Sequence, residues 1–145
     1  MQIFLGGTCG KNTWREAIVI PGLLEREVAL EQIFNPIVEH WDEQAQRRED
    51  EAKADHNYLL LYVLASPDPQ TPDVTQVSGY SLVEAVMSLY DAPERTVVLF
   101  DTTGQARKTT KGMRKAEQDL RKRFPCAMIF GAHEYDRMLD CLAFR

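Results

Sequence analysis

Glu84 stands at a position where a carboxylate can attack a small molecule. It closes the segment Ser78-Gly79-Tyr80-Ser81-Leu82-Val83-Glu84, which links an apolar, strand-like run to a helix-like segment. From Ser81 onward, apolar residues recur at helical spacing, which predicts that Glu84 lies in the first turn of a helix. In open α/β sheets, ligands bind at such strand-to-helix connections. Glu84 is therefore a candidate nucleophile.

A second interpretation of the same residues is structural. Ser81-x-x-Glu84 matches a capping box, in which the two side chains satisfy backbone N–H groups of the first helical turn. Thr13-x-x-Glu16 has the same pattern. Local sequence alone leaves both interpretations open.

The elements that position Glu84 alternate between strand and helix patterns. The predicted strands are residues 2–5, 32–35, 58–64, 96–100 and 127–130. The predicted helices are residues 13–27, with an irregularity at Pro21-Gly22, and residues 41–54, 81–91, 109–123 and 134–142. This alternation is typical of a parallel sheet covered by helices on both faces. We expect an α/β, flavodoxin-like three-layer sandwich with a five-stranded parallel sheet in the order 2-1-3-4-5.

Length and composition narrow the function classes. The 145 residues predict a single domain, residues 1–145, and the net charge of −5 without a long Lys/Arg stripe argues against a duplex nucleic-acid partner. No stretch reaches the length of a membrane span and the start is not a secretory signal, so we expect a cytoplasmic protein. Its three cysteines and three histidines show no paired spacing, so no disulfide, metal or other cofactor is expected.

The glycine-rich loop Gly6-Gly7-Thr8-Cys9-Gly10-Lys11-Asn12 follows the first strand and allows close approach of a ligand to the backbone. It fails as a phosphate-binding P-loop, because Leu5 stands where that pattern needs glycine. Cys9 and Arg15 form a Cys-x5-Arg pattern that suggests a thiolate phosphatase. Glu16 would repel the phosphate in such a site. The phosphatase stays an alternative.

The expected strand order makes the first and third strands neighbours, so the glycine loop and Glu84 would line one crevice. Together with this placement, several short motifs occur in a consistent order: Gly6-Gly7-Thr8, Trp14-Arg15, Phe34-Asn35-Pro36, Trp41, Tyr62-Val63 and Tyr80-Ser81-x-x-Glu84. In this respect the chain resembles the nucleoside 2-deoxyribosyltransferase superfamily, specifically its small deoxyribosyltransferase-like branch. The resemblance extends from Ile3 to about Phe100.

The resemblance implies a cofactor-free enzyme that acts on the N-glycosidic bond of 2′-deoxyribonucleosides or their monophosphates. Glu84 matches the nucleophile that forms a covalent deoxyribosyl intermediate, which passes to another base or to water. The family also uses a second carboxylate on the helix before the third strand. Glu49 and Asp42 are the candidates here. Asp55 precedes a seven-residue strand, and at about 3.3 Å per residue it would lie roughly 20 Å from Glu84.

The expected substrate-binding residues come from three segments. They are Gly6, Gly7 and Thr8 of the glycine loop, Asn35 after the second strand, and Ser78, Tyr80 and Ser81 before Glu84. Trp41 could stack on a base, and residues 66–72 could act as a lid.

The resemblance further implies a homo-oligomer, with a nucleoside or nucleotide as the small-molecule partner. A non-catalytic nucleotide-binding or sensor module on the same fold is the alternative, which Arg47 near the expected second-carboxylate position favours.

Overall fold

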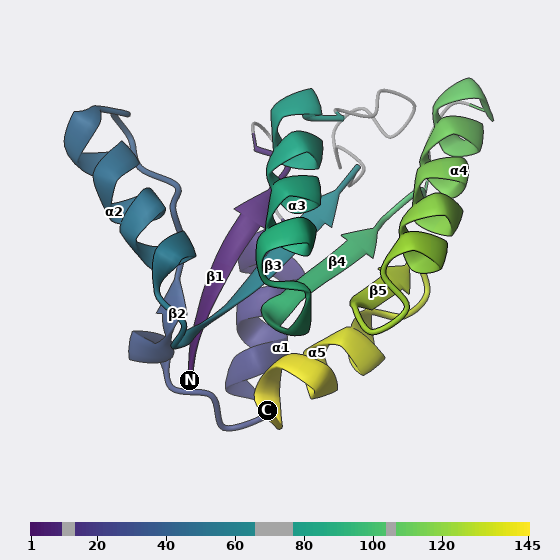
Figure 1. The fold of residues 1–145 in the computed structure, drawn as a ribbon. Coiled ribbons are helices and arrows are strands. Elements are labelled where there is room, and N and C mark those ends of the chain that lie inside the picture. Colours follow the sequence, from purple (N-terminus) through teal and green to yellow (C-terminus); the bar gives the residue numbers. More distant parts are fainter. Residues whose placement is uncertain (10–13, 66–76, 104–106) are drawn as a thin grey trace.

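The computed structural model of the chain describes residues 1–9, 14–65, 77–103 and 107–145. Their core is a five-stranded, all-parallel sheet with helices on both faces (Figure 1). The strand order is β2-β1-β3-β4-β5, which confirms the flavodoxin-like α/β fold predicted from the sequence. The possible lid at residues 66–72 and the proposed cap at Thr13 lie outside the described residues.

The strands follow the apolar runs of the sequence, since a sheet covered on both faces buries both sides of its central strands. Their bounds are β1 (Gln2–Gly7), β2 (Ile33–Phe34), β3 (Tyr58–Leu64), β4 (Thr96–Phe100) and β5 (Met128–Gly131). Strand β2 pairs with β1 through only two residues, where four were expected. It is an edge strand, and after it the chain bends at Asn35 to form a wall of the site described below.

The helices alternate with the strands as expected, although the first is divided. The five α-helices are α1 (Ile20–Leu24), α2 (Glu43–Ala54), α3 (Gly79–Asp91), α4 (Arg107–Arg123) and α5 (Tyr135–Ala143). A π-helical turn, Arg15–Val19, precedes α1, and Pro21 lies in the first turn of α1. Short 3-10 turns, Leu30–Gln32 and Pro93–Arg95, lead into β2 and β4.

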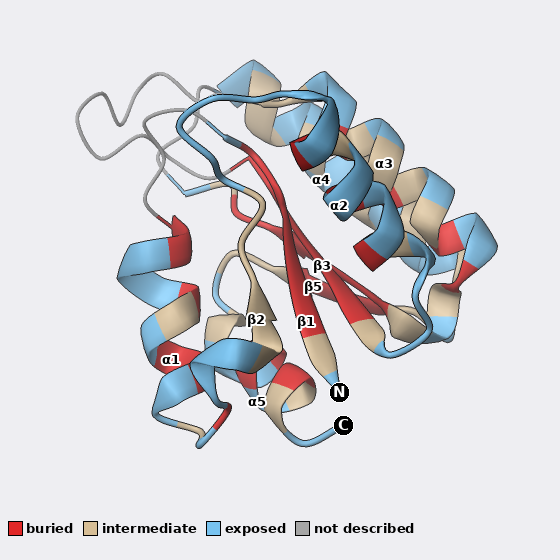
Figure 2. Ribbon diagram, turned by 90° about the vertical axis from the view of Figure 1, so that its left-hand side faces the viewer, coloured by how far each residue is buried: buried red, intermediate tan, exposed pale blue. Residues whose placement is uncertain are grey.

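Alternate residues of the strands build two separate cores. On one face Leu61, Leu99 and their neighbours pack against α1 and α5. On the other face Tyr62, Val98 and their neighbours pack against α2, α3 and α4. Figure 2 shows the resulting layers, with the most buried residues in the central strands.

The pairing of β1 with β3 places the two predicted site segments side by side. Gly6 pairs with Tyr62 and Gly7 with Val63 at the C-terminal ends of the two strands. Strand β1 leads toward β2 on one side and borders β3 on the other, which is the switch point where such sheets bind ligands.

Helix α4 bears on the argument against a duplex nucleic-acid partner, which assumed that basic residues do not gather in one segment. Its sequence, RKTTKGMRKAEQDLRKR, holds eight basic and two acidic residues, and none of its residues is fully buried. Basic residues therefore do gather on one helix, although the net charge of the chain is negative. Within the described residues, no helix is both long and apolar enough to cross a membrane.

Replacing Gly7 with alanine should destabilise the fold. Gly7 has a φ of 121°, and a Cβ atom there would overlap the carbonyl oxygen of Val63. We expect Gly7→Ala to lower the free energy of unfolding by about 2 to 4 kcal/mol in urea denaturation. Gly112→Ala is the matched control, because its Cβ would meet no atom within 4 Å, and it should raise stability by about 0.5 to 1 kcal/mol. Equal effects of the two substitutions would contradict this account.

Candidate active site

Glu84 lies in the second turn of α3. The helix begins at Gly79, and its N-cap is Ser78, whose side-chain oxygen accepts a hydrogen bond from the Ser81 amide at 3.2 Å. The expectation of a first-turn Glu84 in a Ser81-x-x-Glu84 capping box is therefore wrong. The apolar periodicity of this segment begins at Leu82, but the helix begins earlier, at Gly79, directly after its N-cap Ser78. Glu84 is free of any capping role.

The Glu84 carboxylate is held by a lysine from the neighbouring helix. Lys53 of α2 donates a short hydrogen bond from its Nζ to Oε1 of Glu84. The two side chains are only 17% and 14% exposed, so water screens this ion pair weakly. The contacts of the described residues leave Oε2 of Glu84 without a hydrogen-bond partner.

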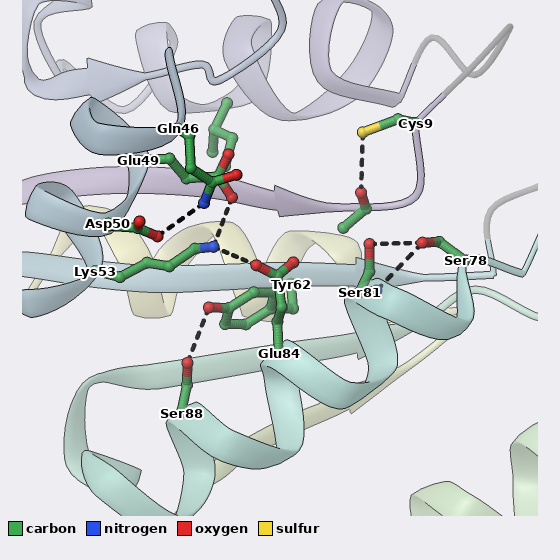
Figure 3. Close-up of polar contacts among 12 residues, drawn as sticks. Cys9, Gln46, Glu49, Asp50, Lys53, Tyr62, Ser78, Ser81, Glu84 and Ser88 are labelled. Carbon is green, nitrogen blue, oxygen red and sulfur yellow. Dashed lines mark hydrogen bonds and ion pairs between the residues drawn. The ribbon is translucent and has the colours of Figure 1, made fainter. Parts of the chain in front are cut away.

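A second carboxylate meets the same ammonium group. Oε1 of Glu49 lies 2.6 Å from Nζ of Lys53, one helical turn away on α2. Glu49 is buried, together with Ala45 and Ala52, on the side of α2 that faces the sheet. Figure 3 shows Lys53 reaching between the two carboxylates. Because both bonded oxygens touch one nitrogen, they lie within about 5 Å of each other.

Burial and charge act in opposite directions on these groups. Burial raises the pKa of Glu84 above its ordinary value, and it outweighs the opposing effect of the hydrogen bond and charge of Lys53. For Lys53, burial disfavours the ammonium, but the hydrogen bonds and charges of Glu49 and Glu84 together raise its pKa above the ordinary lysine value. Lys53 is thus a cation at neutral pH.

Glu49 and Glu84 line a cavity of about 420 Å³. This volume is in the range of small-molecule sites. Its floor is the end of β1, at Gly6 and Gly7, and its walls come from α2, from the start of α3 and from the segment after β2. That segment contributes the side chains Pro36, Ile37, Val38 and Trp41. The cavity therefore combines a buried acid, Glu49, and a largely buried one, Glu84, with an apolar wall.

The structure brings seven of the ten predicted site residues to this cavity. They are Glu84, Glu49, Gly6, Gly7, Ser78, Tyr80 and Ser81. Ser81 is buried and donates a hydrogen bond from its hydroxyl to Oγ of Ser78 at 3.1 Å. Tyr80 is largely exposed at the mouth.

The other three predicted residues do not line the cavity and have structural roles. Asp42 is the N-cap of α2, and its carboxylate accepts a hydrogen bond from the Ala45 amide at 2.7 Å. Thr8 is buried, and its hydroxyl oxygen accepts from the Ala65 amide at 3.2 Å. Asn35 accepts from the Ile37 amide at 3.2 Å, which shapes the bend that presents the apolar wall. Of the two candidates for the second carboxylate, only Glu49 lines the cavity with Glu84 and shares the Lys53 ammonium with it.

Sequence reasoning missed Lys53 and Gln46. Both lie in the mixed-charge run of α2, which looks like a solvated helix face. Gln46 lines the cavity and donates to Oδ1 of Asp50 at 3.0 Å. The available signal was the helical spacing of Ala45, Glu49 and Ala52, which marks the face that packs inward. Asp55, excluded by distance, accepts from the Asn57 amide in the turn before β3.

The Cys-x5-Arg pattern does not form a free anion-binding cradle. Arg15 is buried, and its guanidinium donates to the carbonyl oxygens of Leu5, Thr8 and Gly7 at 3.0 to 3.4 Å. It also lies 3.8 Å from the Cys9 sulfur and stacks over the Trp14 ring. These contacts commit Arg15 to holding the backbone of the loop, which disfavours a phosphatase mechanism.

Searches of protein-family models, of curated proteins and of solved structures find no match to the chain. Among the described residues, no group of three His, Cys, Asp or Glu side chains converges to hold a metal ion. We therefore infer a function from the geometry and chemistry of the cavity itself.

Removal of the Ser78 hydroxyl should uncap α3. We expect Ser78→Ala to lower the free energy of unfolding by about 1 kcal/mol, because the Ser81 amide loses its partner. Ser78→Asp keeps an oxygen acceptor at the same position and should retain most of the wild-type stability. Chemical denaturation of the three proteins measures both effects. A loss of the same size in both variants would show that the cap is not the cause.

Proposed function

We propose that the protein cleaves the N-glycosidic bond of 2′-deoxyribonucleosides or their monophosphates, with Glu84 as the nucleophile. The observation that carries the proposal is the pair of largely buried carboxylates that face one cavity from α2 and α3 and share a single ammonium. Two carboxylates that share one ammonium are close together, as are the two acids of retaining glycosidases, which lie roughly 5 Å apart. The resemblance to nucleoside deoxyribosyltransferases supports the same assignment of Glu84.

The reaction proceeds in two displacements at C1′ of the sugar. An oxygen of Glu84 forms a bond to C1′ while the bond from C1′ to the base nitrogen breaks, and the base leaves with that electron pair and takes up a proton. Water supplies that proton, and Glu49, a carboxylate ion-paired with Lys53, is placed to relay it. An acceptor base or water then attacks C1′, loses a proton and releases the Glu84 carboxylate. Splitting one displacement into two lowers each barrier.

The cavity walls suit the parts of a deoxynucleoside. Trp41 is 55% exposed and lines the cavity, so its ring is available to stack on a base. Ser78 and Ser81 offer hydroxyls at the start of α3 for the 5′ end of the sugar. The apolar wall at residues 36–38 offers a surface against which the base or sugar can pack. We place the protein in the cytoplasm, which keeps thiols reduced and so matches its three free cysteines.

Glu84→Gln should abolish turnover without unfolding the protein. The amide has the same shape but cannot act as an anionic nucleophile, so we expect activity to fall by roughly 10³-fold or more. Wild type and variant are incubated with deoxynucleosides and their monophosphates, with and without an acceptor base, and the products are separated by chromatography. Mass spectrometry of quenched wild-type reactions should show one deoxyribosyl unit on the peptide that contains Glu84.

Asp42→Asn is the matched control, because Asp42 is an acid that caps α2, the helix that carries Glu49, and it lies outside the cavity. It should retain activity, since asparagine also caps helices. Full activity of Glu84→Gln would refute the proposed mechanism. If wild type instead binds nucleotides in calorimetry but turns over none of them, the site is the non-catalytic binding module. The contact that favours this alternative is the ion pair that already engages Glu84.

The pH dependence should report the state of Glu84. Attack requires the carboxylate, and burial raises the pKa of Glu84 above its ordinary value of 4.5. We therefore expect kcat/KM to rise with pH through an acidic limb that lies above 4.5 and then to level off. Steady-state rates from pH 4 to 8 measure this limb. A limb below 4.5 would mean that another group controls the reaction.

We further propose that α3 pairs with a second copy of the chain. Tyr80, Val83, Met87 and Tyr90 form an apolar stripe on α3, each 55% to 68% exposed. Their spacing of three and four residues is that of helices which pack side by side, and such a stripe is complementary to itself. Tyr80 belongs both to the stripe and to the cavity mouth, so a second copy seated there would adjoin the site.

Met87→Lys tests this assembly. A charge in the middle of the stripe should convert the wild-type oligomer to a monomer in analytical ultracentrifugation. Leu24→Lys, at an exposed apolar residue of α1, should leave the assembly unchanged. A monomeric wild type at micromolar concentrations would refute the pairing.

A further inference from the structure

Lys53 borders a different cavity from the one proposed for the substrate. This second cavity, of about 340 Å³, is lined by residues of α2 and α3, and its walls include Lys53, Tyr62 and Glu84. Glu84 borders both cavities, whereas Lys53 lines the second and not the first. The lysine can therefore hold Glu84 without lining the proposed substrate cavity.

Among the described residues, Lys53 is the cation that contacts Glu84, and Arg15 and Arg95 border the cavities that Glu84 lines. From α2, Glu84 faces Glu49 and Asp50 as well as Lys53, and from β3 it faces Tyr62. The Tyr62 hydroxyl is hydrogen-bonded to Ser88 at 2.9 Å, so it is not directed at the carboxylate. Arg15 and Arg95 are both committed to backbone carbonyl oxygens. Among the described residues, Lys53 therefore provides the balancing charge that Glu49 and Glu84 require.

We propose that Lys53 is a positioning residue that keeps Glu84 ionised and fixes one of its oxygens, so that the other can attack the sugar. This inference rests on the proposed function for its catalytic consequence. Its electrostatic part stands on the contacts alone: Oε1 of Glu84 is bonded to Lys53, while Oε2 has no partner among the described residues. Glu49 holds Lys53 in place through the second ion pair. The centroid of the Phe4 ring also lies 5.5 Å from Nζ of Lys53.

An alternative role for Lys53 is purely structural, in which its ion pairs only link α2 to α3. The two roles differ in what happens when the ammonium is removed. If the role is purely structural, removal of the ammonium lowers activity equally at every pH. A residue that keeps Glu84 ionised acts through its charge, so its loss shifts the protonation of Glu84 and the activity returns at higher pH.

The experiment measures the Glu84 carboxyl directly by NMR, in protein labelled with ¹³C at the glutamate side-chain carboxyl. Comparison with Glu84→Gln assigns the signal. In Lys53→Met we expect the titration midpoint of Glu84 to rise by about 1 to 3 pH units relative to wild type, because an opposite charge at contact distance is lost. The acidic limb of kcat/KM should move upward by the same amount. Lys53→Arg should keep both near wild type.

Lys122→Met, at an exposed lysine of α4, is the matched control and should leave the Glu84 midpoint unchanged. If Lys53→Met does not fold, Glu49→Gln/Lys53→Met is compared with Glu49→Gln, which isolates the lysine in a background with one fewer acid. An unchanged midpoint on loss of Lys53 would overturn the inference. A raised midpoint in a protein that turns over no nucleoside would support the electrostatic role of Lys53 and refute only the proposed function.

Discussion

One ammonium shared by two largely buried carboxylates links α2 to α3. Burying an unpaired charge costs several kcal/mol, so Glu49, Glu84 and Lys53 are tolerable only as a group. The group leaves a net negative charge beside a cavity, and buried ion pairs of this kind are often no more stable than apolar residues of similar volume. Such an arrangement is expected where a site needs a reactive carboxylate, because functional sites retain charges that stability alone would remove.

The sheet makes room for this group through two glycines. A Cβ at Gly6 would press on the rings of Phe4 and Tyr62, and Gly7 has a backbone conformation that other residues rarely adopt. Because these two positions carry no side chains, the backbone at the end of β1 forms the floor of the cavity. Trp14 and Arg15 then fix the departing loop by donating to its carbonyl oxygens. The loop serves the site mainly through its shape.

The sequence predicted the fold better than the site. Apolar runs such as Tyr58–Leu64 identify central strands because both faces are buried, and their order along the chain implied the sheet topology. The start of α3 was misplaced, because a serine at Ser78 and one at Ser81 are both plausible caps and only backbone geometry separates them. Lys53 was missed for a different reason: its importance comes from a contact with Glu84, 31 residues away, and no local pattern reveals such a contact.

The most direct test of the central claim is a crystal structure of Glu84→Gln with a deoxynucleoside bound. The account predicts the sugar in the cavity between α2 and α3, with C1′ about 3 to 3.5 Å from the side-chain oxygen of residue 84 and on the side away from Lys53. It also predicts the base against Trp41. A deoxynucleoside bound elsewhere, or one whose sugar points away from residue 84, would contradict the assignment of Glu84 as the nucleophile.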